Sequence, residues 1–498
     1  MHALLATLLG ALFSAALPGV GWWPLALVLV PLFVLIARSP NARGACSLGF
    51  WFAVAFFGLY LLWLPTSFTT LFGPAAWIIY PPLLFILGVF WGLVTGLSRR
   101  LGGPGVGTLA LLPALWVLME WLRTQGYFAF PWGVLGYLWV GTPVAQLAEV
   151  LGVYGLSLLT LTLIALLALP WVRRGQSLRA LLSAALLLGA AWGYGLLREG
   201  MPLPETPYQA LLVQGDTDPL GRAIGAENDL DVYLRLTRWA LADGANPQLI
   251  VWPESVVMGP PLESPAAHGV LQQIQAVAGE IPVITGVSAV NGLVRFNSVY
   301  SLQRGAVLSR YDKVYLVPFG ERWPLIEQLP DLYRAVFGWF GLPMLLNTSA
   351  GQAVTPLQSP VGVIGAYICY ESVFPQVARQ MVAQGAQVLL NISNDAWFGL
   401  GRGAQQHFLM GSLRAIETRR YLLRAGNDGI TAVIDPLGRV QAALPRGGQA
   451  TLMVSYALQD GLTPYVRLGD RWLLVVALYA LLVSLTRSRQ NVLNRIGQ

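Results

Sequence analysis

Three residues of this chain carry side chains that could together perform acyl chemistry. Glu254 ends the apolar run 249–254, and Cys369 lies near the end of a second apolar run, 363–371. Each run is typical of a buried strand that delivers one reactive side chain at its C-terminal end. Lys313 is the only lysine among 31 basic residues. An arginine-biased composition leaves one lysine by chance, but a buried ammonium can also shift its pKa and exchange protons with a neighbour.

Together, these groups could form a thioester. A thiol attacks as its thiolate, so a base must take the proton of Cys369, and Glu254 could accept it. Lys313 could stabilise the anion that develops on a carbonyl oxygen, aided by the backbone N–H that follows Cys369. The three residues lie more than 50 positions apart in the chain, so only a folded domain could bring them together.

Histidine and metal chemistry are the competing interpretations. His407 is close in sequence to Asn394 and Asp395, and a Cys/His pair would need it near the thiol. A single histidine on a predicted helix is more often a hydrogen-bonded packing residue. The sequence has no paired His or Cys spacing typical of a metal site, so we expect neither a metal nor a cofactor.

The composition is that of a membrane protein, because 55% of the 498 residues are hydrophobic and only 11% are charged. A membrane-spanning helix needs about 20 apolar residues, or about 17 at the short end. The second apolar run follows the first after one Pro-Gly turn, so we expect the first to be retained as a span. The eight expected spans cover roughly residues 3–17, 20–37, 47–65, 76–98, 106–122, 148–172, 178–197 and 472–486.

Arginines at the span ends predict the orientation, because basic residues there favour the cytoplasm. We therefore expect both termini in the cytoplasm and the polar segment 205–465 on the other side. The net charge of +7 follows from this cytoplasmic excess, and no nucleic-acid partner is needed to explain it. The ten arginines on the cytoplasmic side are Arg38, Arg43, Arg99, Arg100, Arg173, Arg174, Arg179, Arg487, Arg489 and Arg495.

The same orientation separates the two cysteines. Cys46 is expected at the cytoplasmic end of the third span, whereas Cys369 lies in the external segment. No disulfide between them is therefore expected, and an unpaired thiol in an oxidising compartment is a candidate for reactivity. Cys46, at a helix end among small residues, is expected to be a packing residue.

The external segment alternates predicted strands and helices, which favours an α/β domain of sheets covered by helices. We expect a helical bundle over 1–198, this domain over 205–465 and a final span with its tail over 470–498. The apolar stretch 323–344 could be a core helix or an arm at the bilayer interface. The predicted strands cover 210–214, 249–252, 282–287, 298–303, 361–368, 388–393 and 430–434, and the predicted helices cover 227–242, 266–278, 374–383 and 405–421.

Several motifs resemble a known superfamily. Trp-Pro-Glu at 252–254, Asp-Lys-Val-Tyr-Leu-Val-Pro-Phe-Gly-Glu at 312–321 and Ile-Cys-Tyr-Glu at 368–371 are similar to the Glu-Lys-Cys signatures of the nitrilases, or carbon-nitrogen hydrolases. The segments 393–399, 406–407, 427–431 and 461–465, placed between seven expected spans and one, resemble the apolipoprotein N-acyltransferase family of the bacterial inner membrane. This resemblance implies an inserted nitrilase-like αββα sandwich on the periplasmic face.

The resemblance also implies a two-step reaction. Cys369 would take an acyl chain from a phospholipid such as phosphatidylethanolamine, and the thioester would pass it to the N-terminal α-amine of a diacylglyceryl-cysteine lipoprotein. Glu254 would act as the general base, Lys313 would stabilise the tetrahedral intermediate and Cys369 would be the nucleophile. A monomer is expected.

Four further residues match supporting positions of the family. Glu321 would orient Lys313 or the incoming amine, Tyr370 and Glu371 would be essential neighbours of the nucleophile, and Asn297 would lie near the substrate cleft. Tyr370 and Glu371 could instead be ordinary residues at a strand end. The chain departs from the family at 214–222, where no tryptophan follows Gln-Gly, so the role of that tryptophan is left unassigned.

Two other functions are considered. A membrane-tethered amidase could use the same three residues to hydrolyse small amides. A transporter or scaffold would need charged residues inside the spans as markers of a pathway. Only Glu120 and Glu149 meet that condition, each near a span end, which disfavours a transporter.

Overall fold

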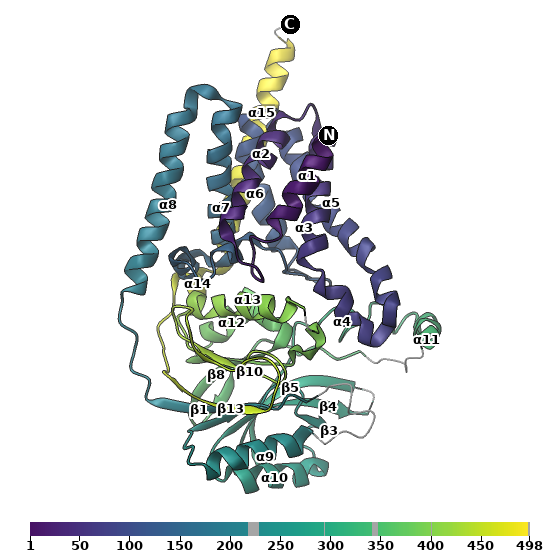
Figure 1. Ribbon diagram of the computed structural model, residues 1–498, viewed down its shortest axis with the longest axis vertical. Helices are drawn as coiled ribbons and strands as arrows, with labels where there is room; N and C mark the ends of the chain where they lie inside the picture. The colour runs from purple at the N-terminus through teal and green to yellow at the C-terminus, as the bar shows by residue number, and fades with distance from the viewer. Residues whose placement is uncertain (218–228, 293, 341–346, 400, 497–498) are drawn as a thin grey trace. The chain divides into compact units, whose positions relative to one another are not determined.

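The computed structural model describes residues 1–217, 229–292, 294–340, 347–399 and 401–496 (Figure 1). The chain divides into two compact units. The helical unit consists of residues 1–200, 401–403 and 468–498, and the α/β unit consists of residues 201–400 and 404–467. Each unit is described by itself.

The helical unit is built from apolar helices. Among the described residues, five are long and apolar enough to cross a membrane: Ala42–Tyr60, Gly73–Gly102, Pro143–Val172, Ser177–Glu199 and Pro464–Arg487. Shorter apolar helices cover His2–Phe13, Trp23–Arg38 and Val106–Leu122. Each of the eight expected apolar stretches overlaps one of these helices. The α-helices are α1 (His2–Phe13), α2 (Leu29–Arg38), α3 (Ala42–Tyr60), α4 (Trp63–Phe72), α5 (Tyr80–Gly102), α6 (Val106–Leu122), α7 (Ala148–Val172), α8 (Ser177–Glu199) and α15 (Leu473–Ile496).

The two carboxylates expected inside the spans have partners within the helical unit. Glu120, on α6, accepts hydrogen bonds from the Leu135 backbone N–H at 3.0 Å and from Trp116 Nε1 at 3.2 Å. Glu149, at the start of α7, forms a 2.6 Å ion pair with Arg198 near the end of α8. Both carboxylates therefore connect segments of the helical unit to one another.

The α/β unit contains two mixed β-sheets. The order of the seven-stranded sheet is β13-β1-β2-β4-β5-β6, with β3 beside β4, and that of the six-stranded sheet is β12-β11-β10-β9-β8-β7. The strands are β1 (Tyr208–Gln214), β2 (Leu249–Val251), β3 (Val257–Gly259), β4 (Val283–Asn291), β5 (Val294–Gln303), β6 (Ala306–Asp312), β7 (Leu357–Ser359), β8 (Gly362–Ile368), β9 (Val388–Ser393), β10 (Leu422–Gly426), β11 (Ala432–Ile434), β12 (Val440–Ala443) and β13 (Ala450–Tyr456).

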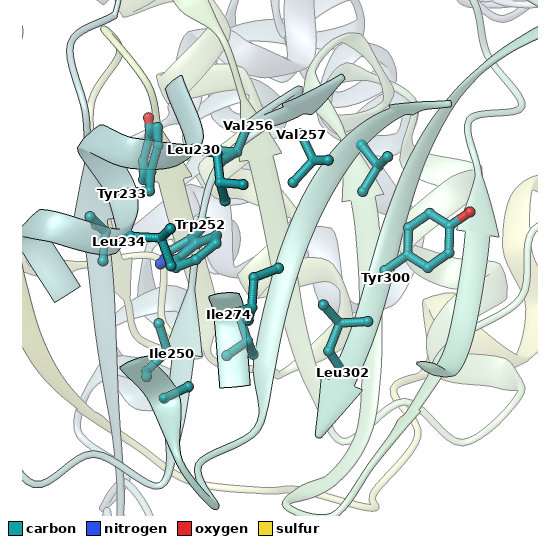
Figure 2. Packing of buried hydrophobic residues seen from close by; sticks show 14 of the residues in the cluster. Leu230, Tyr233, Leu234, Ile250, Trp252, Val256, Val257, Ile274, Tyr300 and Leu302 are labelled. Atoms are coloured by element: carbon teal, nitrogen blue, oxygen red, sulfur yellow. The ribbon is translucent and has the colours of Figure 1, made fainter. Parts of the chain in front are cut away.

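Helices cover the outer faces of both sheets, which gives the expected four-layered αββα arrangement (Figure 1). α9 (Asp229–Ala242) and α10 (His268–Ala278) lie on the seven-stranded sheet, and α12 (Pro375–Ala383) and α13 (Gly403–Thr418) lie on the six-stranded sheet. Between α9, α10 and their sheet, a core cluster includes Tyr233, Trp252 and Ile274 (Figure 2). The buried indole of Trp252 donates a hydrogen bond from Nε1 to Thr237 Oγ1 at 3.0 Å, so its polar atom has a partner.

Each predicted strand and helix of this unit is found to within a few residues, although residues 227–228 of one predicted helix lie outside the described ranges. Six strands were not predicted: β3, β6, β7, β10, β12 and β13. Two stretches differ from their predictions. The helix predicted to reach Tyr421 ends at Thr418, because Arg419 takes a left-handed φ of 52°, and strand β10 follows. In the stretch 323–344, Pro330–Trp339 forms α11, whereas 341–344 lie outside the described residues. Phe337 of α11 packs on Trp323 with the ring centroids 4.9 Å apart, while Trp339 is 90% exposed. The stretch therefore combines a packed face with an exposed one.

Candidate functional site

The three residues predicted to act together each stand just after a strand of the α/β unit. Glu254 follows β2 after Trp252 and Pro253, Lys313 directly follows β6, and Cys369 directly follows β8. All three side chains are buried. Gly286 on β4 permits the close approach at Glu254, because a Cβ atom at this glycine would lie 2.6 Å from the Glu254 Cα atom.

Both carboxylate oxygens of Glu254 are held by hydrogen bonds. Oε1 accepts from Asn297 Nδ2 at 2.7 Å, and Oε2 accepts from the Asn394 backbone N–H at 2.9 Å. Burial raises the pKa of Glu254, Lys313 lowers it, Glu321 raises it, and the net shift is upward. A carboxylate with a raised pKa is a stronger base, which suits it to take a proton from a thiol.

The Lys313 ammonium lies between two carboxylates. Its Nζ atom is 2.9 Å from Glu321 Oε1, 2.8 Å from Glu321 Oε2 and 3.7 Å from Glu254 Oε1. Burial by itself would lower the pKa of Lys313, but Glu321 and Glu254 raise it above its ordinary value. Lys313 therefore stays charged at neutral pH and can stabilise an anion without giving up its proton.

Asn297 connects the two carboxylates. Its Nδ2 atom donates to Glu254 Oε1 and, at 2.8 Å, to Glu321 Oε1, while its backbone carbonyl accepts from the Lys313 N–H at 2.8 Å. Glu321 is also held from its own loop, because Oε2 accepts from the Val317 N–H at 2.9 Å. One amide side chain therefore fixes the spacing of two like charges around a single ammonium.

Cys369 occupies a strained turn between β8 and the short 3-10 helix Cys369–Val373. Its φ of +47° lies in the left-handed region, which a residue with a Cβ atom seldom adopts. Such strain is often found at functional sites, where surrounding contacts must maintain it. Burial raises the pKa of the Cys369 thiol, Glu254 raises it further and Lys313 lowers it. The thiol is therefore protonated at rest and needs a base when it attacks.

Glu371, two residues after the nucleophile, connects two segments of the site through hydrogen bonds. Its side chain is fully buried and accepts from Tyr311 Oη at 2.7 Å and from the backbone N–H groups of Val314, Tyr315 and Ile368 at 2.8, 3.1 and 2.9 Å. These contacts join the turn of Cys369 to the loop that carries Lys313. Tyr370 is also buried, and its ring packs on Phe374 with the centroids 5.1 Å apart.

Sequence reasoning named Asp395 and His407 as sequence neighbours but missed the buried ion pair that Asp395 forms with Arg424. Asp395 Oδ2 accepts from Arg424 Nη2 at 2.6 Å, and Asp395 Oδ1 lies 3.1 Å from His407 Nδ1. Burial would raise the pKa of Asp395, but Arg424 and the neighbouring His407 hold it well below its ordinary range. The position of Asp395, two residues after β9, could have indicated a functional side chain. Arg424 could not be found in this way, because it lies inside a strand that the apolar pattern did not predict.

The structure therefore brings Glu254, Lys313, Asn297 and Glu321 into one hydrogen-bonded cluster that acts electrostatically on Cys369. The geometry disfavours the Cys/His alternative, because His407 Nε2 contacts the Cys369 backbone carbonyl oxygen at 3.0 Å and Ser372 Oγ at 2.8 Å. Within the described ranges, no group of three or more His, Cys, Asp or Glu residues could hold a metal ion. Of the departing segment 214–222, residues 218–222 lie outside the described residues.

Comparison with known proteins covers both units. A family model for carbon-nitrogen hydrolases matches residues 212–461, and a model for the N-terminal domain of apolipoprotein N-acyltransferases matches residues 9–166. An apolipoprotein N-acyltransferase of Geobacter metallireducens is 32% identical over 489 residues, which covers 94% of this chain and 91% of the relative. One from Pseudomonas aeruginosa PAO1 is 35% identical over 492 residues, covering 93% and 91%. Among solved structures, an amidase from Nesterenkonia sp. matches with a TM-score of 0.37 and 19% identity, over 53% of this chain and 95% of the amidase.

Proposed function

Because the chain belongs to the apolipoprotein N-acyltransferase family, we propose that it transfers an acyl chain from a membrane phospholipid to the N-terminal α-amine of a diacylated lipoprotein. The acyl donor is a phospholipid such as phosphatidylethanolamine. The acceptor amine belongs to a diacylglyceryl-cysteine, and the product is a triacylated lipoprotein. An acyl thioester on Cys369 connects the two half-reactions.

In the first half-reaction, Glu254 takes the proton of the Cys369 thiol while sulfur attacks the ester carbonyl of the phospholipid. The new S–C bond places a negative charge on the carbonyl oxygen, which Lys313 and a backbone N–H stabilise. When this intermediate collapses, the C–O bond to the glycerol breaks. The leaving alkoxide takes the proton from Glu254, so a lysophospholipid departs and the site returns to its original charge.

In the second half-reaction, the neutral α-amine attacks the thioester carbonyl. Glu254 accepts a proton from the attacking nitrogen, the C–S bond breaks, and the departing thiolate regains that proton. Glu321 keeps Lys313 in place through both half-reactions, and Asn297 keeps Glu254 and Glu321 at a fixed spacing. Tyr370 and Glu371 support the turn that presents the thiol.

The helical unit suits this function because both substrates are lipids. We propose that eight spans, seven within 1–198 and one within 470–498, hold the chain in the bacterial inner membrane as a monomer. Both termini are then cytoplasmic, and the catalytic domain 205–465 lies in the periplasm, where the donor and the acceptor share the outer leaflet. Confinement to one surface raises their effective concentration and excludes water that would hydrolyse the thioester. The apolar helices and the distribution of arginines support this arrangement.

The observation that carries the proposal is the cluster of buried Glu254, buried Lys313 and half-buried Glu321 beside a thiol held in a strained turn. It is tested by incubating the purified protein with phosphatidylethanolamine labelled in its acyl chain, without an acceptor. We expect one label per protein, on Cys369, that hydroxylamine releases and that a diacylated lipopeptide removes. Cys46 provides a matched control, because Cys46→Ser should keep the label and Cys369→Ala should lose it.

The amidase alternative predicts a different outcome of the same experiment. An enzyme built for hydrolysis would release the label as free fatty acid before any lipopeptide is added. It would also cleave short amides at a rate that the lipopeptide does not affect. Rapid release of fatty acid, with no transfer to the peptide, would contradict the proposed acyl transfer.

A further inference from the structure

A buried polar network lies directly behind the nucleophile and takes no part in the proton transfers described above. It consists of Asp395 after β9, His407 on α13 and Arg424 on β10, each at most 2% exposed. Two opposite charges and an imidazole are costly to bury, so such groups are usually held by complete hydrogen bonding. Here the network ends on the backbone of Cys369.

The contact with Cys369 is made by the imidazole ring. His407 Nε2 lies 3.0 Å from the Cys369 carbonyl oxygen and 2.8 Å from Ser372 Oγ. A carbonyl oxygen can only accept, so Nε2 must carry the hydrogen that it donates. The other ring nitrogen lies 3.1 Å from Asp395 Oδ1, and this carboxylate is itself held by Arg424 and, at 2.7 Å, by Ser393 Oγ. The ring therefore cannot turn without breaking several buried contacts.

Holding this carbonyl also sets the direction of the next N–H. The carbonyl of Cys369 and the N–H of Tyr370 belong to one planar trans peptide group, so they point in opposite directions. Because Cys369 has a left-handed φ of +47°, the orientation of this peptide group is not the one that the chain would adopt by itself. A hydrogen bond to the carbonyl on one side therefore fixes the N–H on the other side.

We propose that His407, oriented by Asp395 and Arg424, is a positioning residue for the oxyanion site. It holds the peptide group between Cys369 and Tyr370 so that the Tyr370 N–H points at the oxygen that becomes negative during acyl transfer. This inference rests on the proposed function, in which that N–H assists Lys313. It assigns the imidazole no proton transfer with the thiol.

The experiment compares a reaction that forms an oxyanion with one that does not. Acylation of Cys369 passes through a tetrahedral oxyanion, whereas alkylation of the same thiol by iodoacetamide is a direct displacement without one. Both rates are measured in the full-length protein carrying Cys46→Ser. For His407→Phe, we expect the acylation rate to fall about 10- to 100-fold. The reason is that displacing an oxyanion donor, here the Tyr370 N–H, by about 1 Å lowers a rate on that order. Alkylation should remain within about threefold of the parent.

Two further variants separate positioning from folding. His407→Gln keeps an N–H donor of similar reach, so it should recover at least about fivefold of the acylation lost in His407→Phe. Ser372→Ala removes the other neighbour of Nε2 but leaves the contact with the carbonyl, so both rates should stay within about threefold of the parent. If acylation and alkylation fall in parallel in His407→Gln and His407→Phe, the ring serves folding or thiol activation and the inference is wrong. Unchanged acylation in His407→Phe would overturn it equally.

Two acyl donors distinguish this inference from the proposed function. Acylation is measured with labelled phosphatidylethanolamine and with a soluble p-nitrophenyl ester. If the parent protein reacts with the ester but not with the phospholipid, the proposed function fails, while the ester still tests His407. If the parent reacts with both donors and His407→Phe reacts with each of them as fast as the parent does, the proposed function stands and the positioning role of His407 is wrong.

Discussion

Replacing Lys313 tests whether the site needs an ammonium or only a positive charge. In Lys313→Met, the carboxylates of Glu254 and Glu321 would lose the cation between them and keep only Asn297 as a shared donor. At 3.7 Å and an effective dielectric constant of about 20, the attraction between Lys313 and Glu254 is roughly 4.5 kcal/mol. Without it the pKa of Glu254 rises further, so less of the base is ionised at neutral pH.

The expected loss of rate follows from that energy. Each 1.4 kcal/mol corresponds to about a tenfold change in an equilibrium constant, so the ionised fraction of Glu254 at neutral pH falls by up to about 10³-fold. The missing oxyanion donor adds to this loss, so we expect acylation in Lys313→Met to fall at least about 10³-fold. In Lys313→Arg the charge remains, but the planar guanidinium cannot take the place of a compact ammonium, and a loss of about 10- to 100-fold is expected.

The assay is the single-turnover rate of Cys369 labelling by phosphatidylethanolamine, with thermal unfolding as the control for folding. Alkylation by iodoacetamide reports the remaining reactivity of the thiol, and it should fall in Lys313→Met because Glu254 is a weaker acceptor of protons when it is largely protonated. The reasoning would be refuted by a folded Lys313→Arg protein that labels within threefold of the wild type, since the ammonium would then be dispensable.

Three other perturbations test neighbouring contacts. Glu321→Gln removes a charge that raises the pKa of Glu254, so the acid limb of the acylation rate should move to lower pH; a pH profile showing an upward shift would contradict this. Glu371→Gln replaces a carboxylate that accepts four hydrogen bonds by an amide whose NH₂ group would face donors. The free energy of unfolding should fall by about 2–4 kcal/mol, measured by thermal unfolding. An unchanged melting temperature would contradict the structural role of Glu371. Gly286→Ala places a Cβ atom 2.6 Å from the Glu254 Cα atom and should lower the free energy of unfolding by about 1–3 kcal/mol. The control is Gly269→Ala on helix α10, where the new Cβ atom meets open space. This variant should leave stability unchanged or raise it slightly.

Much of the fold of the α/β unit could be predicted from hydrophobic patterns. Strands β8 and β9 are buried parallel strands, and such strands are continuous apolar runs that stand out in a sequence. Strand β10 could not be found this way, because Arg424 interrupts its five residues and the strand begins soon after a helix. Buried acceptors on Asp395, Asn391 and Ile430 make an arginine acceptable there.

The candidate site was predictable in its residue types but not in its connections. The run that ends in Glu254 and the run that contains Cys369 near its end identified two reactive groups, and the unique lysine identified a third. Nothing in the spacing indicates that the Asn297 amide bridges two carboxylates, because that contact depends on how β5 and the loop after β6 pack. The family resemblance pointed to Asn297 as a residue of the cleft without its contacts.

The sequence by itself determined the apolar helices, the alternation of strands and helices, and which side chains could perform acyl transfer. These properties are local, since each depends on the composition or periodicity of a short segment. Only the tertiary structure decided that Lys313 contacts Glu321 more closely than Glu254, and that His407 faces a backbone carbonyl instead of the thiol. The physical reason is that hydrogen bonds depend on a few tenths of an ångström between groups far apart in the chain, and those distances are set by the packing of whole sheets.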